Sequence, residues 1–96
     1  MLLDQIRQLN SSLNSLAAQF GGSRLRVFGS VARGEEGPDS DVDFLVDFPQ
    51  GYDPLTQRMP LAQGLSDLLH RRVDLVPEHE LNEHVRAQVL AEAVPL

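Results

Sequence analysis

Cysteine is absent from this chain of 96 residues, and its absence excludes both disulfide bonds and a zinc site built from thiolates. Any metal ion must then be bound by oxygen atoms or by histidine. Long apolar runs are absent too, since none approaches the ~18 residues that indicate a membrane-spanning helix. The start of the chain, Met1 to Asp4, lacks the basic stretch that opens a signal peptide. We therefore expect a cytoplasmic protein with no membrane association.

Basic residues are also few. The chain has 8 basic residues against 14 acidic ones, which leaves a formal net charge of −6 at pH 7. Affinity for nucleic acids depends largely on cationic side chains that contact phosphates, so this balance argues against stable nucleic-acid binding.

The length of the chain predicts one domain that spans residues 1–96. A domain of this size buries roughly 60–70% of its unfolded surface around a single core. Hydrophobic residues make up 42% of the chain and charged residues 23%. These fractions are ordinary for a globular protein and too apolar for a disordered one.

Apolar residues from Leu2 to Phe20 recur at alternating steps of four and three, the spacing of one buried helix face. They predict one helix over residues 3–20, which Gly21 and Gly22 should end. The strands expected after it cover residues 25–28, 41–46 and 71–77, with an edge strand over 93–96. The helical elements are a turn over 31–33, a helix over 55–69 and a helix over 80–91. Pro60 should start or kink the regular part of the helix over 55–69. A polar loop over 35–39 and an irregular connection over 48–54 complete the chain.

Two of these helices should each present one apolar face. The residues at helical spacing are Leu55, Met59, Ala62, Leu65 and Leu69 in the first, and Leu81, Val85 and Val89 in the second, with Leu90 and Ala93 near its edge. The order of elements, with a short hairpin-like link between the first two strands, predicts an α+β fold. In this fold a mixed sheet of three to four strands is backed by helices.

A Gly-Ser turn and a pair of acids carry the functional signal. Gly29 and Ser30 follow the first expected strand, ten residues intervene, and Asp41 and Asp43 open the next apolar run. Successive side chains of a strand alternate between faces, so both acids point to one side. Mg²⁺ prefers oxygen ligands and usually binds one or two carboxylates together with substrate phosphates. Glycine lets a phosphate approach the backbone closely. The pattern therefore indicates a phosphate site beside a metal site.

At these residues the chain resembles the minimal nucleotidyltransferase (MNT) family of the DNA polymerase β-like nucleotidyltransferase superfamily. The family signature is Gly-Ser, ten residues and then Asp-x-Asp, and the chain matches it without a gap. The resemblance covers essentially the whole chain and implies the same α+β architecture. It also implies that Gly29, Ser30 and Arg33 bind the nucleotide, and we call these three residues the phosphate site.

A third acid, Asp74, lies in the third expected strand. If this strand lies beside the second, Asp74 stands next to Asp41 and Asp43, and we call these three residues the acid cluster. Three clustered carboxylates repel one another unless cations neutralise them, so the cluster predicts bound Mg²⁺. The resemblance implies that all three acids are catalytic and metal-binding, that the third helps to activate the attacking hydroxyl, and that up to two Mg²⁺ ions act.

Minimal nucleotidyltransferases of this size resemble the antitoxins of type VII two-gene systems, whose partner is an all-helical HEPN-domain ribonuclease toxin. The resemblance implies an enzyme that transfers AMP from ATP to a tyrosine hydroxyl of that toxin. A second class of function stays open, in which the chain is a non-catalytic antitoxin that neutralises a HEPN toxin by forming a complex. An oligomer, of this chain alone or with its partner, is compatible with both functions.

Each of these residues also has a simpler interpretation. Asp41 and Asp43 are of the kind found at the solvated end of a strand, and a Gly-Ser pair alone is usually only a turn. Asp74 follows two arginines and is placed to pair with one of them. Arg33 has two interpretations, contact with a phosphate or closure of the loop. Three histidines have no recognisable ligand spacing and are expected at the surface: His70, His79 and His84.

Overall fold

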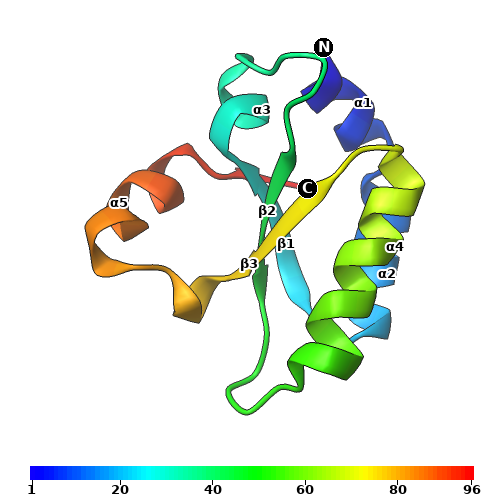
Figure 1. The fold of residues 1–96 in the computed structure, drawn as a ribbon, viewed down its shortest axis with the longest axis vertical. Helices are drawn as coiled ribbons and strands as arrows, with labels where there is room; N and C mark the ends of the chain where they lie inside the picture. The colour runs from blue at the N-terminus through cyan, green and yellow to red at the C-terminus, as the bar shows by residue number, and fades with distance from the viewer.

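A four-stranded mixed sheet forms the centre of the computed structural model, which describes residues 1–96 (Figure 1). The strands lie in the order β3-β2-β1-β4, with β1 antiparallel to both of its neighbours and β2 parallel to β3. In chain order the elements are α1 (Leu2–Gln8), α2 (Asn10–Gln19), β1 (Ser23–Phe28), α3 (Gly29–Arg33), β2 (Val42–Asp47), the π-helical turn η1 (Pro54–Arg58), α4 (Met59–Leu69), β3 (Val73–Pro77), the 3₁₀ turn η2 (Glu78–Glu80), α5 (Glu83–Glu92) and β4 (Val94–Pro95).

The register of the sheet brings the ends of three strands together. Phe28 at the end of β1 pairs with Asp43 near the start of β2, and Asp43 pairs with Asp74 near the start of β3. α3 follows β1 directly at this end of the sheet. Paired residues on adjacent strands point to the same face, so Asp43 and Asp74 lie side by side on one face.

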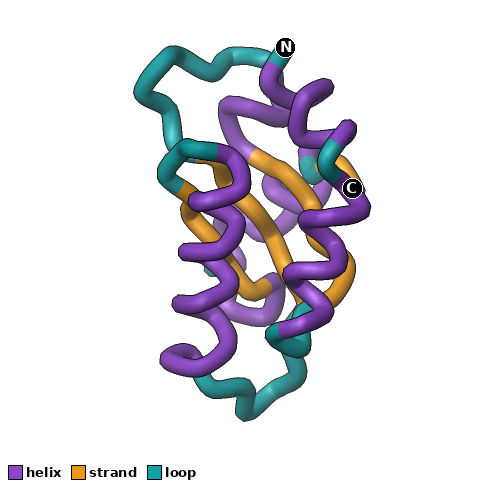
Figure 2. Tube along the Cα trace, turned by 90° about the vertical axis from the view of Figure 1, so that its right-hand side faces the viewer, coloured by secondary structure: helices purple, strands orange, loops and turns teal.

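The other face of the sheet carries the apolar core. α2 and α4 pack side by side across this face (Figures 1 and 2). Val42, Phe44 and Val46, the alternate residues of β2, are fully buried beneath them. Each such side chain contributes about 1.5–3 kcal/mol through its burial. The packing of this face thus holds the opposite residues of β2, including Asp43, toward the other side.

A buried arginine lies on the face opposite α2 and α4. Arg26 of β1 is only 5% exposed. Its guanidinium donates hydrogen bonds to carboxylate oxygens of Asp47 (2.6 Å) and Glu78 (2.8 Å) and to the carbonyl oxygen of Arg24 (2.8 Å). The hydrogen bond from Arg26 holds the pKa of Glu78 below its usual range. Arg86 also donates to Glu78 (3.2 Å), so this network connects β1, β2, η2 and α5.

The expected helix over 3–20 is in fact two helices, α1 and α2, with a break at Leu9, so that prediction is wrong. An asparagine and two serines follow the break, and such residues form local hydrogen bonds that favour helix ends over helix interiors. Ile6 and Leu13 lie on either side of the break and are both fully buried. The apolar spacing therefore continues through the break. The predicted end of the helical segment is confirmed, because Gly21 has a φ of 81°.

The expected helix over 55–69 differs at its beginning. A π-helical turn, Pro54–Arg58, precedes α4, and the N–H of Met59 donates to the carbonyl of Pro54. Leu55 and Met59 do not share the buried face, since they are 73% and 60% exposed. The wider π turn shifts the helix out of the phase that a constant 3.6-residue period assumes. Pro60 lies in the first turn of α4, as expected. Leu61 and Leu65 of α4 are buried in the core, and the expected Ala62 and Leu69 pack against it while partly buried.

The last helix begins later than residue 80 and is packed more lightly than expected. Asn82 forms the N-cap of α5 by accepting a hydrogen bond from the N–H of His84 (2.8 Å). Val89 is the only buried residue of this helix. Leu81 lies before the helix, and Val85 is 44% exposed, so neither belongs to a buried helix face. Contacts other than apolar packing must therefore help to hold α5.

The predicted fold class is confirmed, because a mixed sheet of four strands is backed by helices. The expected edge strand is also present as β4, whose Val94 pairs with Val27 of β1. None of the helices combines the length and the apolar character that would let it cross a bilayer.

Candidate active site

The phosphate site begins where β1 ends. Gly29 and Ser30 are the first residues of α3, and Gly34 ends this short helix with a left-handed φ of 72°. Val31 of α3 is fully buried, which fixes the helix against the sheet. Arg33 points its guanidinium toward two acids, Glu35 and Glu92.

Gly29 and Asp43 approach each other closely. Gly29 has a φ of 75°, which is unfavourable for any residue with a side chain. A Cβ atom at this position would lie 2.2 Å from Oδ2 of Asp43. Glycine is therefore required here for two reasons, and the expected phosphate site and metal site adjoin each other.

Replacing Gly29 with alanine should therefore be more harmful than the same change at Gly51. Gly51 has a similar φ of 82°, but a Cβ atom there would meet nothing within 4 Å. We expect Gly51→Ala to cost about 1–2 kcal/mol of unfolding free energy through its left-handed backbone alone. Gly29→Ala adds a clash with Asp43, which typically costs a further ~1–3 kcal/mol. Urea unfolding of both variants measures the difference, and equal losses would contradict the close approach.

Burial and neighbouring charges together raise the pKa of Asp43. Burial is the largest cause, followed by the negative charges of Asp74 and Asp41, while Arg33 opposes the shift and Glu92 adds to it. A carboxylate in this position is stabilised by a nearby cation. The donors at this end of the sheet are carboxylate oxygens, which fit Mg²⁺.

Asp41 makes a different contact from the other two acids. It lies one residue before β2, and its Oδ1 forms an ion pair with Nε of Arg72 (3.1 Å). The simpler interpretation considered for Asp74, a pair with a neighbouring arginine, thus applies to Asp41. No three side chains of the histidine, aspartate and glutamate type are gathered closely enough to hold a metal ion as they stand. The metal-binding roles of Asp41, Asp43 and Asp74 stay a prediction.

An acid from α5, Glu92, contacts two residues of the expected phosphate site. Oε1 of Glu92 accepts the backbone N–H of Gly29 (3.0 Å), and Oε2 accepts Nη1 of Arg33 (3.0 Å). Arg33 also donates to Glu35 (2.9 Å). These hydrogen bonds raise the pKa of Arg33 above its ordinary value. Arg33 thus pairs with Glu35 in the following loop and with Glu92 of α5.

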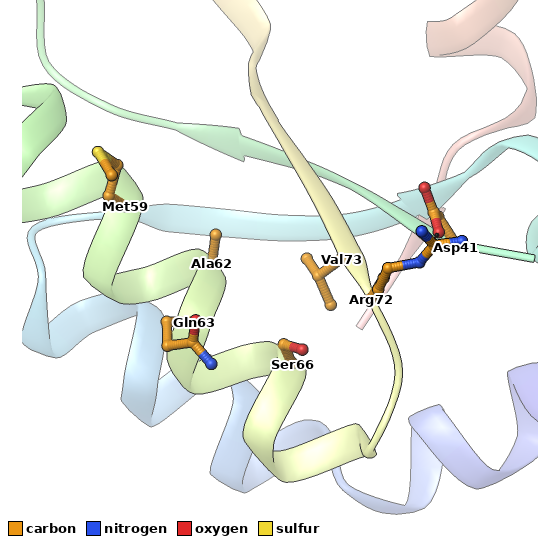
Figure 3. Close-up of a pocket in the computed structure, with 7 residues that line it drawn as sticks. All are labelled: Asp41, Met59, Ala62, Gln63, Ser66, Arg72 and Val73. Atoms are coloured by element: carbon orange, nitrogen blue, oxygen red, sulfur yellow. Dashed lines mark ion pairs between the residues drawn. The ribbon is translucent and has the colours of Figure 1, made fainter.

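A groove opens at the β3 edge of the sheet, and Asp41 is the one member of the acid cluster that lines it. The groove has a volume of about 430 Å³ and lies between α4 and the start of β3. Figure 3 shows the pair of Asp41 and Arg72 at one end of this groove. The residues that line it are Asp41, Met59, Ala62, Gln63, Ser66, Arg72 and Val73.

Two residues of this region were not expected from the sequence. Glu92 was assigned no role, because it lies 63 residues from Gly29 and belongs to no local motif. Arg72 was expected only as a neighbour of Asp74, whereas it pairs with Asp41. In both cases the partner is brought near by the folding of distant strands and helices, and no spacing in the sequence signals it.

Known proteins match this chain over nearly its whole length. The model of the nucleotidyltransferase domain family matches residues 4–96. The protein adenylyltransferase MntA of Thermococcus cleftensis is 39% identical to this chain, over 98% of the chain and 95% of MntA. MJ0126 of Methanocaldococcus jannaschii, provisionally named a protein adenylyltransferase, is 31% identical over 91% of the chain and 90% of its own length.

Solved structures give the same assignment. A protein described provisionally as a minimal nucleotidyltransferase superimposes with a TM-score of 0.86 and 47% identity, covering 100% of this chain and 97% of its own. A chain from a toxin–antitoxin complex with AMP-PNP gives a TM-score of 0.75 at 25% identity, covering 90% and 70%. A complex of tri-AMPylated Shewanella oneidensis HEPN toxin with its MNT antitoxin gives 0.68 at 25% identity, covering 92% and 69%. The chain therefore belongs to the nucleotidyltransferase domain family, and within it to the minimal nucleotidyltransferases.

Proposed function

We propose that this nucleotidyltransferase is the antitoxin of a HEPN/MNT pair and transfers AMP from Mg²⁺-bound ATP to a tyrosine hydroxyl of its HEPN partner. The observation that carries the proposal is the adjacency of Gly29 and Asp43, which joins a place for phosphate to a place for cations. MntA, an adenylyltransferase that acts on protein, matches the chain over nearly its whole length. The AMPylated toxin in complex with an MNT antitoxin supports the same partner and the same reaction.

The acid cluster supplies the ligands for Mg²⁺ in this proposal. Asp43 and Asp74 are register partners on one face, and Asp41 precedes them at the same end of β2. Asp41 would leave its pair with Arg72, which is an exposed ion pair and therefore weak. When bound, Mg²⁺ neutralises the triphosphate and makes the attacking hydroxyl more acidic.

The phosphate site orients the nucleotide. The N–H of Gly29 and the guanidinium of Arg33 are donors suited to phosphate oxygens. They lie on the β1 side of the acid cluster, whereas the groove lies on the β3 side. In phosphoryl transfer the attacking and leaving oxygens are roughly in line. We therefore place the departing pyrophosphate near α3 and the entering hydroxyl near the β3 edge.

The reaction balances as one substitution at the α-phosphorus of ATP. The tyrosine oxygen forms a bond to the α-phosphorus. The bond between the α-phosphorus and the oxygen that bridges to the β-phosphate breaks. Pyrophosphate leaves, and the hydroxyl proton goes to the carboxylate of Asp74, which is exposed near the start of β3. The chain's contribution is positioning and charge stabilisation.

The proposal is tested with the purified chain, ATP labelled at its α-phosphate, Mg²⁺ and a candidate HEPN-domain partner protein. We expect label on a tyrosine of the HEPN protein, together with a loss of its ribonuclease activity. The matched control replaces the acceptor tyrosine with phenylalanine, which removes the attacking oxygen and little else. An unlabelled partner, with both proteins folded and the ribonuclease active beforehand, would contradict the proposal.

The alternative, neutralisation through complex formation, rests on the exposed apolar residues of the chain. Leu55 lies in η1 and Met59 at the start of α4, and Val85 and Leu90 lie on α5. A variant in which both Asp41 and Asp43 are changed to asparagine separates the two functions. We expect it to fail to rescue cells from the toxin, whereas full rescue would favour the binding function.

A further inference from the structure

Glu92 holds the two groups of the phosphate site that a triphosphate would need. Its two carboxylate oxygens each accept a hydrogen bond of 3.0 Å, one from the N–H of Gly29 and one from Nη1 of Arg33. The side chain is only 19% exposed, so this is a packed contact and not a loose surface pair. A carboxylate offers the same acceptor chemistry and the same sign of charge as a phosphate.

A bound triphosphate and this position of Glu92 exclude each other. The N–H of Gly29 is a single donor, and Glu92 already occupies it. The charge of Glu92 also acts on Asp43, where it adds to the causes that raise the pKa of that acid. A triphosphate entering beside Glu92 would thus meet an additional negative charge next to the acid cluster, where like charges already repel.

The attachment of α5 allows Glu92 to move. Val89 is the only buried residue of the helix, and Leu90 is partly exposed. Near its beginning α5 contacts η2 through Arg86 and Glu78 (3.2 Å), and at its end it contacts α3 through Glu92. Breaking the contact of Glu92 therefore costs little apolar burial.

We propose that Glu92 is a positioning residue that competes internally with the nucleotide, holding Gly29 and Arg33 while the site is empty and leaving them when the triphosphate binds. This inference rests on the proposed function, because it needs the triphosphate at Gly29 and Arg33. Glu92 then lowers the affinity of the site for nucleotide and couples nucleotide binding to the position of α5.

The test compares Glu92→Gln with Glu83→Gln, a matched change at an exposed acid in the first turn of the same helix. Calorimetric titrations with Mg²⁺-ATP and with Mg²⁺-tripolyphosphate measure affinity. We expect Glu92→Gln to bind both ligands about tenfold more tightly than wild type, the size of effect that a hydrogen bond between charged groups supplies. Glu83→Gln should bind as wild type does. In the transfer reaction KM for ATP should fall while kcat stays unchanged.

Each other outcome has a definite meaning. Unchanged or weaker binding by Glu92→Gln, with wild type binding nucleotide, overturns the inference and leaves the proposed function intact. Failure of every variant and of wild type to bind either ligand overturns both. A gain for ATP without a gain for tripolyphosphate also overturns the inference, because the competition would then not be at the phosphates. Glu92→Ala removes the whole carboxylate and should show the same gain in affinity. It serves as the test variant if Glu92→Gln is poorly folded.

Discussion

Replacing Asp43 with asparagine should abolish adenylyl transfer without unfolding the protein. We expect kcat/KM to fall by at least about 10²–10³-fold, the loss that follows removal of one preorganised group that stabilises transition-state charge. The neutral amide cannot balance the charge of a cation as the carboxylate does, so the Mg²⁺ site should be lost with it. Single-turnover transfer to the HEPN partner measures the effect.

The stability of Asp43→Asn separates a functional acid from a structural one. The pKa of Asp43 is raised in the folded protein by burial and by Asp74 and Asp41. A carboxyl with a raised folded-state pKa favours folding when it is protonated, so at neutral pH its charged form opposes folding. The asparagine variant should therefore be as stable as wild type or more stable at pH 7.

The control for Asp43→Asn is Asp67→Asn, a change of an exposed acid on α4 whose carboxylate accepts a hydrogen bond from Gln63. The amide oxygen of asparagine can accept the same bond, so activity and stability should both be unchanged. Transfer by Asp43→Asn at the wild-type rate would contradict the assignment of Asp43 to the site. Unfolding of this variant would show that Asp43 has a structural role instead.

The second large effect concerns stability and comes from Arg26. Replacing it with methionine keeps an apolar stem of similar length but leaves the carboxylates of Asp47 and Glu78 without their partner. Breaking a buried ion pair costs about 3–5 kcal/mol. The two acids here are 27% and 23% exposed, so water replaces part of the interaction and we expect a loss of about 2–3 kcal/mol. For a domain of this size that loss lowers Tm by roughly 10–20 °C.

Arg24→Met provides the control for Arg26→Met. Arg24 also contacts Asp47 (3.2 Å), but its side chain is 67% exposed, so the variant should lose at most ~0.5 kcal/mol of unfolding free energy.

The pH dependence of stability provides a second test of Arg26. Arg26 lowers the pKa of Glu78 from its ordinary value of 4.5, so Glu78 adds stability above pH 4.5 that is lost as the pH falls through the lowered value. This acid-dependent loss should be smaller in Arg26→Met, and equal melting of the two arginine variants would contradict the account.

Local signals in the sequence were enough to predict the centre of the site. The spacing from Gly29 to Asp43 and the period-2 alternation of β2 are properties of neighbouring residues, and they correctly predicted a turn beside a strand whose Asp43 faces away from the core. Asp41 lies one residue before that strand and pairs with Arg72. The pairing of β2 with β3, the condition on which the expected position of Asp74 depended, is confirmed by the register of Asp43 with Asp74. The catalytic and metal-binding roles of these residues stay predictions.

The features that the sequence did not reveal depend on contacts between distant residues or on an irregular helix. The break at Leu9 preserves the apolar spacing on both sides, and the π turn before Met59 changes the phase that a constant period assumes. Glu92 reaches Gly29 only because β4 returns the end of the chain to the edge of β1. A hydrogen bond between residues so far apart leaves no mark on local composition.

The most direct test of the account is the Mg²⁺ dependence of ATP binding in wild type and in Asp43→Asn. If the acid cluster binds Mg²⁺ next to the phosphate site, wild type should bind ATP at least about tenfold more tightly with Mg²⁺ than without it, because the ion offsets the repulsion between the acids and the triphosphate. In Asp43→Asn this difference should largely disappear. An equal Mg²⁺ dependence in both proteins would contradict the central claim that Asp43 links the cation to the nucleotide.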